Sequence, residues 1–497
     1  MLKFLRWIAI CSILALFPSF FPGFLVIAGT KIPTDSVYRD TQLDAVTDFL
    51  SSYIRIESET GNEGEAGKFF AEYCEAKGLY VHYFSTSNSS YNFAASLYPL
   101  ALSKPNIILL NHIDVVPAGD TSVWLHQPYS GDIKDGFVWG RGALDAKGLA
   151  AMQLMALLAL KDQGSEEPFP YNVTILSVSN EEDGGKKGAK LITDNYLEFL
   201  KPVVVLGEGG SGFSGVLSSK PDAAVFGISM AEKSSLWLKL QIKQQSNGHG
   251  ATPTYDYANR LMISALNNIN NMKEKLRFNK SNRLMFRRIG RAEGGLRGFI
   301  IRKFNWGIFT PIVKYFIKDD PLYRSLVTNT ITVTNLFNPP GPPNQVSDLS
   351  IALLDCRLLP GTNRKTFINK LKRVLDEPAI EIDILDSSPD AEATKPDRAY
   401  QALEEAILAV YKDAYVIPIL FPATTDNSFF RAHGVPVYGL LPGIMDKEMI
   451  ASIHSVNEKI SFEVLQSGMD IYTRFLVNMM DVKYKPPGLL RLVDIKK

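Results

Sequence analysis

The sequence predicts an α/β fold, with a mixed, mostly parallel sheet that carries helices on both faces. Three short and nearly continuous apolar runs, at 106–111, 173–178 and 203–206, are typical of strands buried on both faces. An Ala/Leu/Met-rich segment at 149–160 is apolar nearly all round, so we expect an interior helix there. Strands that alternate with helices of this size indicate βαβ units.

The middle of the chain follows a different pattern, in which strand-like segments alternate apolar and polar residues. The expected strands are 234–242, 328–336, 346–357 and 380–385, and the expected helices are 255–271 and 363–375. Their order, β-α-β-β-α-β, predicts a small inserted domain of the ferredoxin-like α+β type. Apolar strands at 415–420 and 436–441 and a helix at 462–480 then resume the first pattern. We therefore expect a catalytic domain in two parts, 34–228 and 389–497, with the inserted domain at 229–388.

Composition restricts the class of protein. A chain of 497 residues is long enough for two domains. Its net charge of +1 argues against a nucleic-acid partner. The three cysteines cannot form a disulfide framework, and Cys74 and Cys356 are expected to be buried thiols.

The first 33 residues are expected to lie outside the catalytic body. Lys3 and Arg6 precede an apolar run at 7–28, whose length is near the ~20 residues that cross a bilayer. The segment is a signal peptide or a membrane anchor, with the anchor favoured because the run is long for a signal peptide. Either way the body is expected to be extracytoplasmic, membrane-anchored or secreted.

A basic stretch at 273–318 carries thirteen Lys and Arg residues against two acidic ones, interleaved with large apolar residues. Such a stretch can lie on a membrane or lipid surface, or it can be a solvated helical elaboration of the inserted domain. The sequence leaves both alternatives open.

Histidines and carboxylates follow the expected buried strands. His112 and Asp114 come after the first, the pair Glu181 and Glu182 after the second, and Glu208 after the third. Because the carboxyl ends of parallel strands meet at one edge of a sheet, these side chains are expected to lie together.

Two further residues complete the set, although each has an ordinary alternative. Asp145 lies in a glycine-rich turn that opens the interior helix, where an N-cap is the favoured interpretation of an isolated Asp. His454 lies in a loop before the last helix, where a histidine is usually only solvated. Together the residues offer two imidazoles and three carboxylates as ligands and leave Glu181 free for proton transfer, which suits two-metal hydrolysis of an amide.

These motifs, in this order over nearly everything after the leader, resemble the co-catalytic zinc aminoacylase/carboxypeptidase family. The resemblance implies two zinc ions held by His112 and Glu208, by Glu182 and His454, and by Asp145 as the bridge. It also implies that Asp114 orients His112 and that Glu181 is the general base. One departure is Gly207, where several relatives have an acid before the glutamate ligand.

The inserted domain at 229–388 resembles the family's lid and dimerisation domain. In this lid, the resemblance implies that His249, within Asn-Gly-His-Gly, stabilises an oxyanion, commonly in the partner subunit's site of a homodimer. It further implies that Asn344 and Arg357 bind the substrate's carboxylate, although a structural salt bridge remains an alternative for Arg357. Thr425, Asp426 and Ser428 match a loop of the family that borders the site.

The function expected from this resemblance is cleavage, or reversible formation, of the amide bond of a small-molecule N-acyl amino acid. The apolar leader and the long lid elaboration resemble the carboxypeptidase S and N-fatty-acyl-amino-acid synthase/hydrolase branch. The apolar residues within 273–318 suggest a lipidic acyl chain. One alternative is a carboxypeptidase that acts on short peptides, and another is a non-catalytic, membrane-tethered ligand-binding protein with a hydrolase fold.

Overall fold

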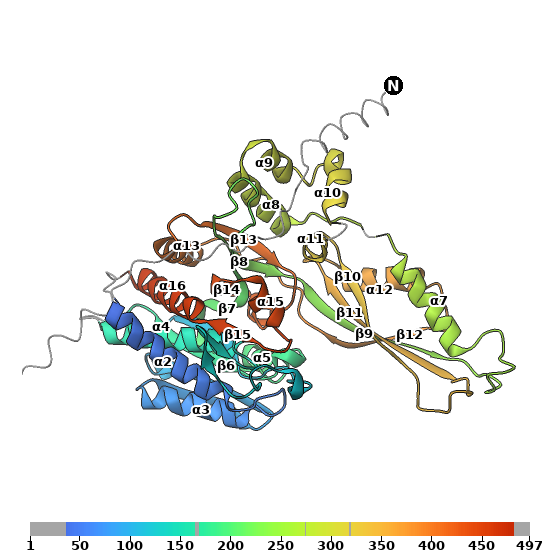
Figure 1. Ribbon diagram of the computed structural model, residues 1–497, viewed down its shortest axis with the longest axis horizontal. Helices are drawn as coiled ribbons and strands as arrows, with labels where there is room; N and C mark the ends of the chain where they lie inside the picture. The colour runs from blue at the N-terminus through green and yellow to red at the C-terminus, as the bar shows by residue number, and fades with distance from the viewer. Residues whose placement is uncertain (1–35, 165–167, 274, 318–319, 482–497) are drawn as a thin grey trace, which may run out of the picture.

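The computed structural model describes residues 36–481, apart from 165–167, 274 and 318–319 (Figure 1). The expected signal peptide or anchor at 1–33 lies outside the described residues. Among the helices that are described, none is both long and apolar enough to cross a membrane.

The catalytic body is built on an eight-stranded sheet with the order β1-β2-β6-β3-β7-β14-β8-β13. Its strands are β1 (Tyr80–Ser87), β2 (Ser90–Ser96), β3 (Asn106–His112), β6 (Asn172–Val178), β7 (Pro202–Phe213), β8 (Val225–Glu232), β13 (Tyr415–Phe421) and β14 (Val437–Ile444). The central strands β6, β3, β7 and β14 pair in parallel, whereas β1 and β2 pair antiparallel at one edge. The predicted mixed, mostly parallel sheet is confirmed.

Helices cover both faces of this sheet. One face packs against α2 (Ser36–Ile54), α3 (Gly64–Ala76), α4 (Lys147–Gln163), α13 (Arg398–Val410) and α16 (Phe462–Met480). The other face packs against α5 (Ala189–Asn195), α6 (Leu197–Leu200) and α14 (Asn427–Ala432). The helix α4 is buried on nearly all sides, as its apolar sequence predicts, because α2 and α16 also pack on it.

A separate four-stranded antiparallel sheet, with the order β10-β11-β9-β12, forms the inserted segment that was expected to be the lid, and we keep the name lid for it (Figure 1). Its elements are β9 (Ser234–Lys243), α7 (Ala258–Asn270), β10 (Thr330–Phe337), β11 (Leu349–Leu358), α12 (Arg364–Leu375) and β12 (Glu381–Ser387). They follow the predicted β-α-β-β-α-β order, and the two helices share a core with the strands. The expected boundary at residue 229 falls inside β8 of the large sheet; the chain passes to the lid at Lys233, where the alternating pattern begins.

The described part of the basic stretch forms helices outside the lid sheet. These helices are α8 (Lys280–Glu293), α9 (Gly295–Arg302) and α10 (Thr310–Ile317), and they are followed by α11 (Pro321–Val327). Met285 and Phe286 of α8 pack with Ile417 and Leu420 of β13, so α8 covers the edge strand of the large sheet (Figure 1). In the sequence these helices lie between two elements of the lid, α7 and β10, but α8 packs on the large sheet.

A small sheet, β15-β5-β4, and a short helix lie beside the site. They comprise β4 (Ile133–Lys134), β5 (Phe137–Trp139), α15 (Lys447–Ser452) and β15 (Lys459–Ser461). The cysteines Cys74 and Cys356 are both buried and free, as predicted.

Candidate metal centre

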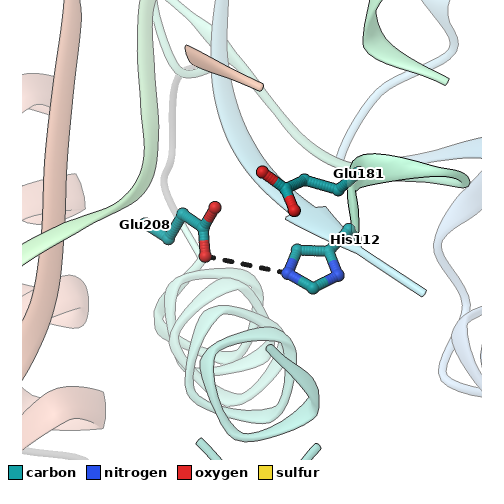
Figure 2. A group of neighbouring side chains, drawn as sticks. All are labelled: His112, Glu181 and Glu208. Atoms are coloured by element: carbon teal, nitrogen blue, oxygen red, sulfur yellow. Dashed lines mark ion pairs between the residues drawn. The ribbon is translucent and has the colours of Figure 1, made fainter. Parts of the chain in front are cut away.

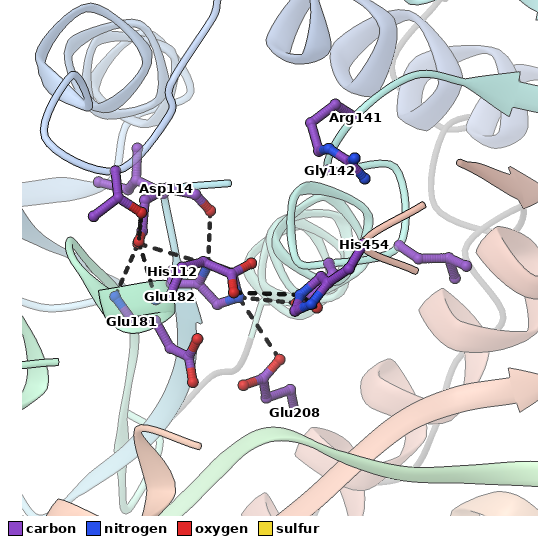
Figure 3. A network of polar contacts seen from close by, with 12 residues as sticks. His112, Asp114, Arg141, Gly142, Glu181, Glu182, Glu208 and His454 are labelled. Carbon is purple, nitrogen blue, oxygen red and sulfur yellow. Dashed lines mark hydrogen bonds and ion pairs between the residues drawn. The ribbon is translucent and has the colours of Figure 1, made fainter. Parts of the chain in front are cut away.

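The structure brings together all the predicted ligand residues at the carboxyl edge of the central strands, and Figure 3 labels four of them: His112, Glu182, Glu208 and His454. His112 is the last residue of β3, and Glu181 and Glu182 form a 3-10 turn (Glu181–Asp183) just after β6. His454 comes from the loop between α15 and β15. Glu208 corrects our expectation, because it lies within β7 rather than after it. The glycines around Glu208 suggested a loop, but they let β7 lie close to β14 and β8, where a Cβ on Gly210 would lie 1.8 Å from a backbone oxygen.

Asp145 lies between the two histidines. Its Oδ1 is 3.0 Å from Nε2 of His112, and its Oδ2 is 3.1 Å from Nε2 of His454. The N-cap interpretation of Asp145 is wrong, because Ala146 occupies that position of α4 and no side chain caps the helix. The carboxylate instead joins two imidazoles that are 342 positions apart in the sequence, as a bridging ligand would.

Two overlapping groups of side chains could each hold a cation. The ligand-type atoms of His112, Glu181 and Glu208 lie within 4.8 Å of one another, as do those of His112, Asp145 and Glu182. Figure 2 shows the carboxylates of Glu181 and Glu208 both beside the His112 ring, with the ion pair between Glu208 and His112 drawn as a dashed line. Glu182 also approaches His454, with 3.3 Å between Oε2 and Nε2.

Asp114 contacts His112, but through its main chain. The Nδ1 atom of His112 donates to the backbone carbonyl oxygen of Asp114 at 2.8 Å, whereas the nearer carboxylate oxygen is 3.7 Å away. That bond fixes the tautomer and leaves the Nε2 lone pair facing the cluster. The Asp114 carboxylate accepts instead from the backbone N–H groups of Glu181 and Glu182, both at 3.1 Å. One aspartate therefore positions the histidine and the 3-10 turn together.

Glu458 holds the backbone around Asp145 in place, and the sequence analysis did not predict this role. Its buried carboxylate accepts from the backbone N–H groups of Gly142, Leu144 and Asp145 and pairs with Arg141 at 2.7 Å. It lies in the same loop as His454, so one loop supplies a ligand and also fixes the backbone of Asp145. No local pattern signals this role, because its partners lie more than 310 residues earlier in the chain.

The charges of the cluster fit a bound cation. Burial raises the pKa of Glu208 to about 7, with the neighbouring Asp145 carboxylate adding to the shift, and burial together with Glu208 raises the pKa of Glu181 well above its usual value. The lone pair on His112 Nε2 faces the oxygens of Asp145 and Glu208, and Glu182 Oε1 is buried with no hydrogen-bond partner. A bound cation would satisfy acceptors that face one another in this way, and the imidazole and carboxylate groups suit zinc.

The C-terminal loop that borders the site rests on a buried ion pair. Arg431 contacts Glu232 at 2.8 Å, and the other carboxylate oxygen of Glu232 accepts from the Thr425 hydroxyl at 2.9 Å. In the same loop, Asn427 donates to the backbone oxygen of Glu208 at 2.7 Å. Thr425 and Asp426 line the cleft described next, whereas Ser428 is buried and does not line it.

A cleft of about 360 Å³ opens over the cluster, between the two sheets. Glu181, Glu182, Glu208, Asp145 and His454 lie along it, and its apolar lining includes Trp237, Phe421, Phe429 and Leu441. Arg357 reaches the cleft from β11 of the lid. Its Nε donates to Asp355, so it makes the alternative structural salt bridge while still lining the cleft. Among the described residues of 273–318, none lines this cleft, so their apolar side chains do not form an acyl pocket there.

The other two lid residues lie far from this cleft. His249 and Asn344 are exposed neighbours, joined by backbone pairing of His249 with Gln345. They lie beyond the Lys243/Leu349 end of the β9–β11 pair, whereas Arg357 is at the other end (Figure 1). Eight residues of extended strand separate the ends, which corresponds to roughly 25–30 Å. Within one chain, the structure does not bring them to the metal cluster.

This α/β fold, with imidazoles and carboxylates clustered at a cleft, defines a metal-dependent hydrolase. The model of peptidase family M20/M25/M40 matches residues 108–478, and the chain belongs to this family. It is accordingly a metallohydrolase that acts on amide bonds.

Similar proteins span most of the chain. Probable carboxypeptidase S-like 2 of Dictyostelium discoideum is 25% identical over 82% of this chain and 79% of its own length. The N-fatty-acyl-amino acid synthase/hydrolase PM20D1 of Xenopus tropicalis is 26% identical over 84% of this chain and 78% of its own. An M20 family metallo-carboxypeptidase from Sulfolobus solfataricus shares the fold with a TM-score of 0.65 at 18% identity, covering 88% of this chain and 100% of its own.

Proposed function

We propose that this protein is a two-zinc amidohydrolase that cleaves, or reversibly forms, the amide bond of N-acyl amino acids, including N-fatty-acyl amino acids. The observation that carries the proposal is the cleft itself. Glu181 lines it from the large sheet, Arg357 lines it from the lid, and Trp237, Phe421 and Phe429 supply an apolar wall. An N-acyl amino acid has the matching parts: an amide, a carboxylate for a guanidinium and an apolar acyl chain.

The chain's own residues divide the chemical work. We assign His112 and Glu208 to one zinc, Glu182 and His454 to the other, and Asp145 to the bridge. When bound, the zinc pair supplies Lewis acidity that polarises the scissile carbonyl and lowers the pKa of a water molecule. Glu181 accepts the proton of the attacking water and then delivers it to the leaving nitrogen. Burial suits Glu181 to both steps, because a raised pKa lets the carboxyl hold a proton near neutral pH.

The residues at the far end of the lid act in trans in this proposal. His249 stabilises the oxyanion, and Asn344 binds the substrate, in the site of a partner subunit of a homodimer. The supporting observation is that both are exposed, adjacent to each other and remote from the cluster of their own chain.

The acyl chain is assigned from the cleft and from the relatives, not from the basic stretch. The apolar residues of 273–318 suggested a lipidic substrate, but those that are described lie outside the cleft. The support for a fatty acyl chain now comes from the apolar wall of the cleft near Trp237. We also propose an extracytoplasmic location, membrane-anchored or secreted, because of the apolar run at 7–28.

A carboxypeptidase acting on short peptides is the second candidate. It is favoured by the carboxypeptidase S-like relative and by Arg357, since a peptide has the same terminal carboxylate.

Three substrates with the same phenylalanine head group separate these functions: N-oleoyl-phenylalanine, N-acetyl-phenylalanine and alanyl-phenylalanine. We expect the largest kcat/KM for the oleoyl substrate, and an amide product from oleate and phenylalanine in the reverse direction. Trp237→Ala is expected to lower kcat/KM for the oleoyl substrate by roughly tenfold and to leave the acetyl substrate nearly unchanged. Preference for the dipeptide would refute N-acyl amino acids as the substrate class, and preference for the acetyl substrate would refute the fatty acyl chain.

A further inference from the structure

The basic elaboration ends in a layer that nothing in the described chain covers. The helix α8 lies on β13, and α9 lies on α8 at the periphery of the molecule (Figure 1). The two helices touch through glycines: a Cβ on Gly298 would lie 2.2 Å from the backbone oxygen of Gly290, and one on Gly290 would lie 2.5 Å from that of Gly298. This close packing fixes α9 on the core, so its outer residues are presented by a rigid support.

Large apolar side chains project from α9 and from the turn that follows it. Leu296 is 58% exposed, Phe299 41%, Trp306 46% and Ile308 73%. Leu296 and Phe299 are three residues apart and therefore share one side of α9. A group of exposed apolar residues of this size marks a contact surface rather than ordinary exposure.

Cations lie directly against these side chains. The guanidinium of Arg302 is 5.9 Å from the centre of the Phe299 ring, and Nζ of Lys303 is 4.2 Å from that of Trp306. The only acidic residue in the sequence from 275 to 317 is Glu293, which is buried and lies 3.9 Å from Arg297. This surface therefore combines apolar side chains with positively charged ones and carries no acidic side chain of its own. We name it the α9 ridge, and it consists of Leu296, Phe299, Arg302, Lys303, Trp306 and Ile308.

We propose that the α9 ridge docks on an anionic lipid surface. Apolar and tryptophan side chains flanked by Lys and Arg match the boundary between acyl chains and anionic headgroups. A second copy of the chain would bring like charges together, and the substrate's acyl chain is excluded because the ridge does not line the cleft. The apolar run at 7–28 would provide a second attachment, and two attachments in one chain reinforce each other.

The test measures the surroundings of the ridge in the full chain. A polarity-sensitive dye is placed on Phe299→Cys, and, as the matched control, on Leu336→Cys, an apolar residue of the lid that is 47% exposed. Both variants carry Cys11→Ser, and the buried Cys74 and Cys356 are protected from labelling. Each protein is reconstituted into vesicles of phosphatidylcholine alone or of an equal mixture with phosphatidylglycerol.

We expect the dye at position 299, and not at 336, to move to an apolar environment in anionic vesicles only. Salt at ~1 M should reverse the shift, because it screens charges beyond about 3 Å. The double variant Arg302→Gln with Lys303→Gln should lower the docking equilibrium constant by roughly tenfold or more without changing hydrolysis of a soluble substrate.

Three results would overturn the proposal. The first is a dye at 299 that stays water-exposed in anionic vesicles. The second is an equal response at 299 and 336, or in neutral vesicles, which would assign the effect to the leader. The third is a shift without vesicles that grows with protein concentration, which would assign the ridge to a second copy of the chain.

Discussion

The metal cluster and the far end of the lid sheet differ in how their functional side chains are held. In the cluster, His112 is 2% exposed and its ring is fixed by a hydrogen bond to a backbone carbonyl. The carboxylate of Glu458 fixes the turn that carries Asp145. At the far end of the lid, His249 is exposed, and its ring accepts only a local hydrogen bond from the Ala251 N–H. The difference shows that the described residues of one chain hold the metal cluster in place by themselves but leave His249 far from it. In our proposal, His249 acts in the site of a second chain.

The largest effect is expected from the base. Glu181→Gln should lower kcat/KM by roughly a thousandfold or more, because the amide cannot accept the proton of water. Bound metal, measured by mass spectrometry of the native protein, should stay unchanged. Glu182→Gln is the matched control next to it, and it should lose metal. Activity of Glu181→Gln within tenfold of the native chain would remove Glu181 from its role.

A smaller effect, and a sharper test of the comparison, comes from His249. His249→Ala should lower kcat by about 10²–10³-fold while the metal stays bound, as for loss of one oxyanion donor. Mixing this variant with Glu181→Gln chains should restore activity, because a mixed dimer contains one site with both residues intact. If the mixture stays as inactive as its components, His249 does not act in trans.

The smallest effect is expected from Glu458, which holds the backbone that carries Asp145. Glu458→Gln should weaken metal binding by about 10–100-fold, since the backbone N–H groups that carry Asp145 lose a charged acceptor. Glu448→Gln is the control, because Glu448 makes only an exposed ion pair with Lys459. Zinc competition with a fluorescent chelator measures both. Equal metal affinity in the two variants would show that Glu458 does not position the ligands.

Local patterns predicted much of the fold. The buried runs that became β3 and β6, the interior helix α4 and the final helix at 462–480 were all visible as continuous or periodic apolar residues. The packing of α8 on β13 was not, because an amphipathic helix does not encode which surface it covers.

The residues of the site show the same difference between what local patterns predict and what depends on distant parts of the chain. Residue types at strand ends indicated His112 and Asp114, the pair Glu181 and Glu182, and Glu208. The glycine-rich turn and the C-terminal loop offered Asp145 and His454, and the family resemblance supplied the separate roles and the lid residues. Asp145 was ambiguous because an Asp that opens a helix suits a cap and a ligand equally well. Glu458 could not be predicted at all, since its partners lie over 310 residues away in sequence.

Metal titration of the purified native chain tests the central claim most directly. After removal of metal by a chelator, zinc should bind at two sites per chain and restore amide hydrolysis. His112→Ala and His454→Ala should each weaken one of those sites, whereas His249→Ala should retain both. A chain that binds no stoichiometric metal, and gains no activity from added zinc, would contradict the account.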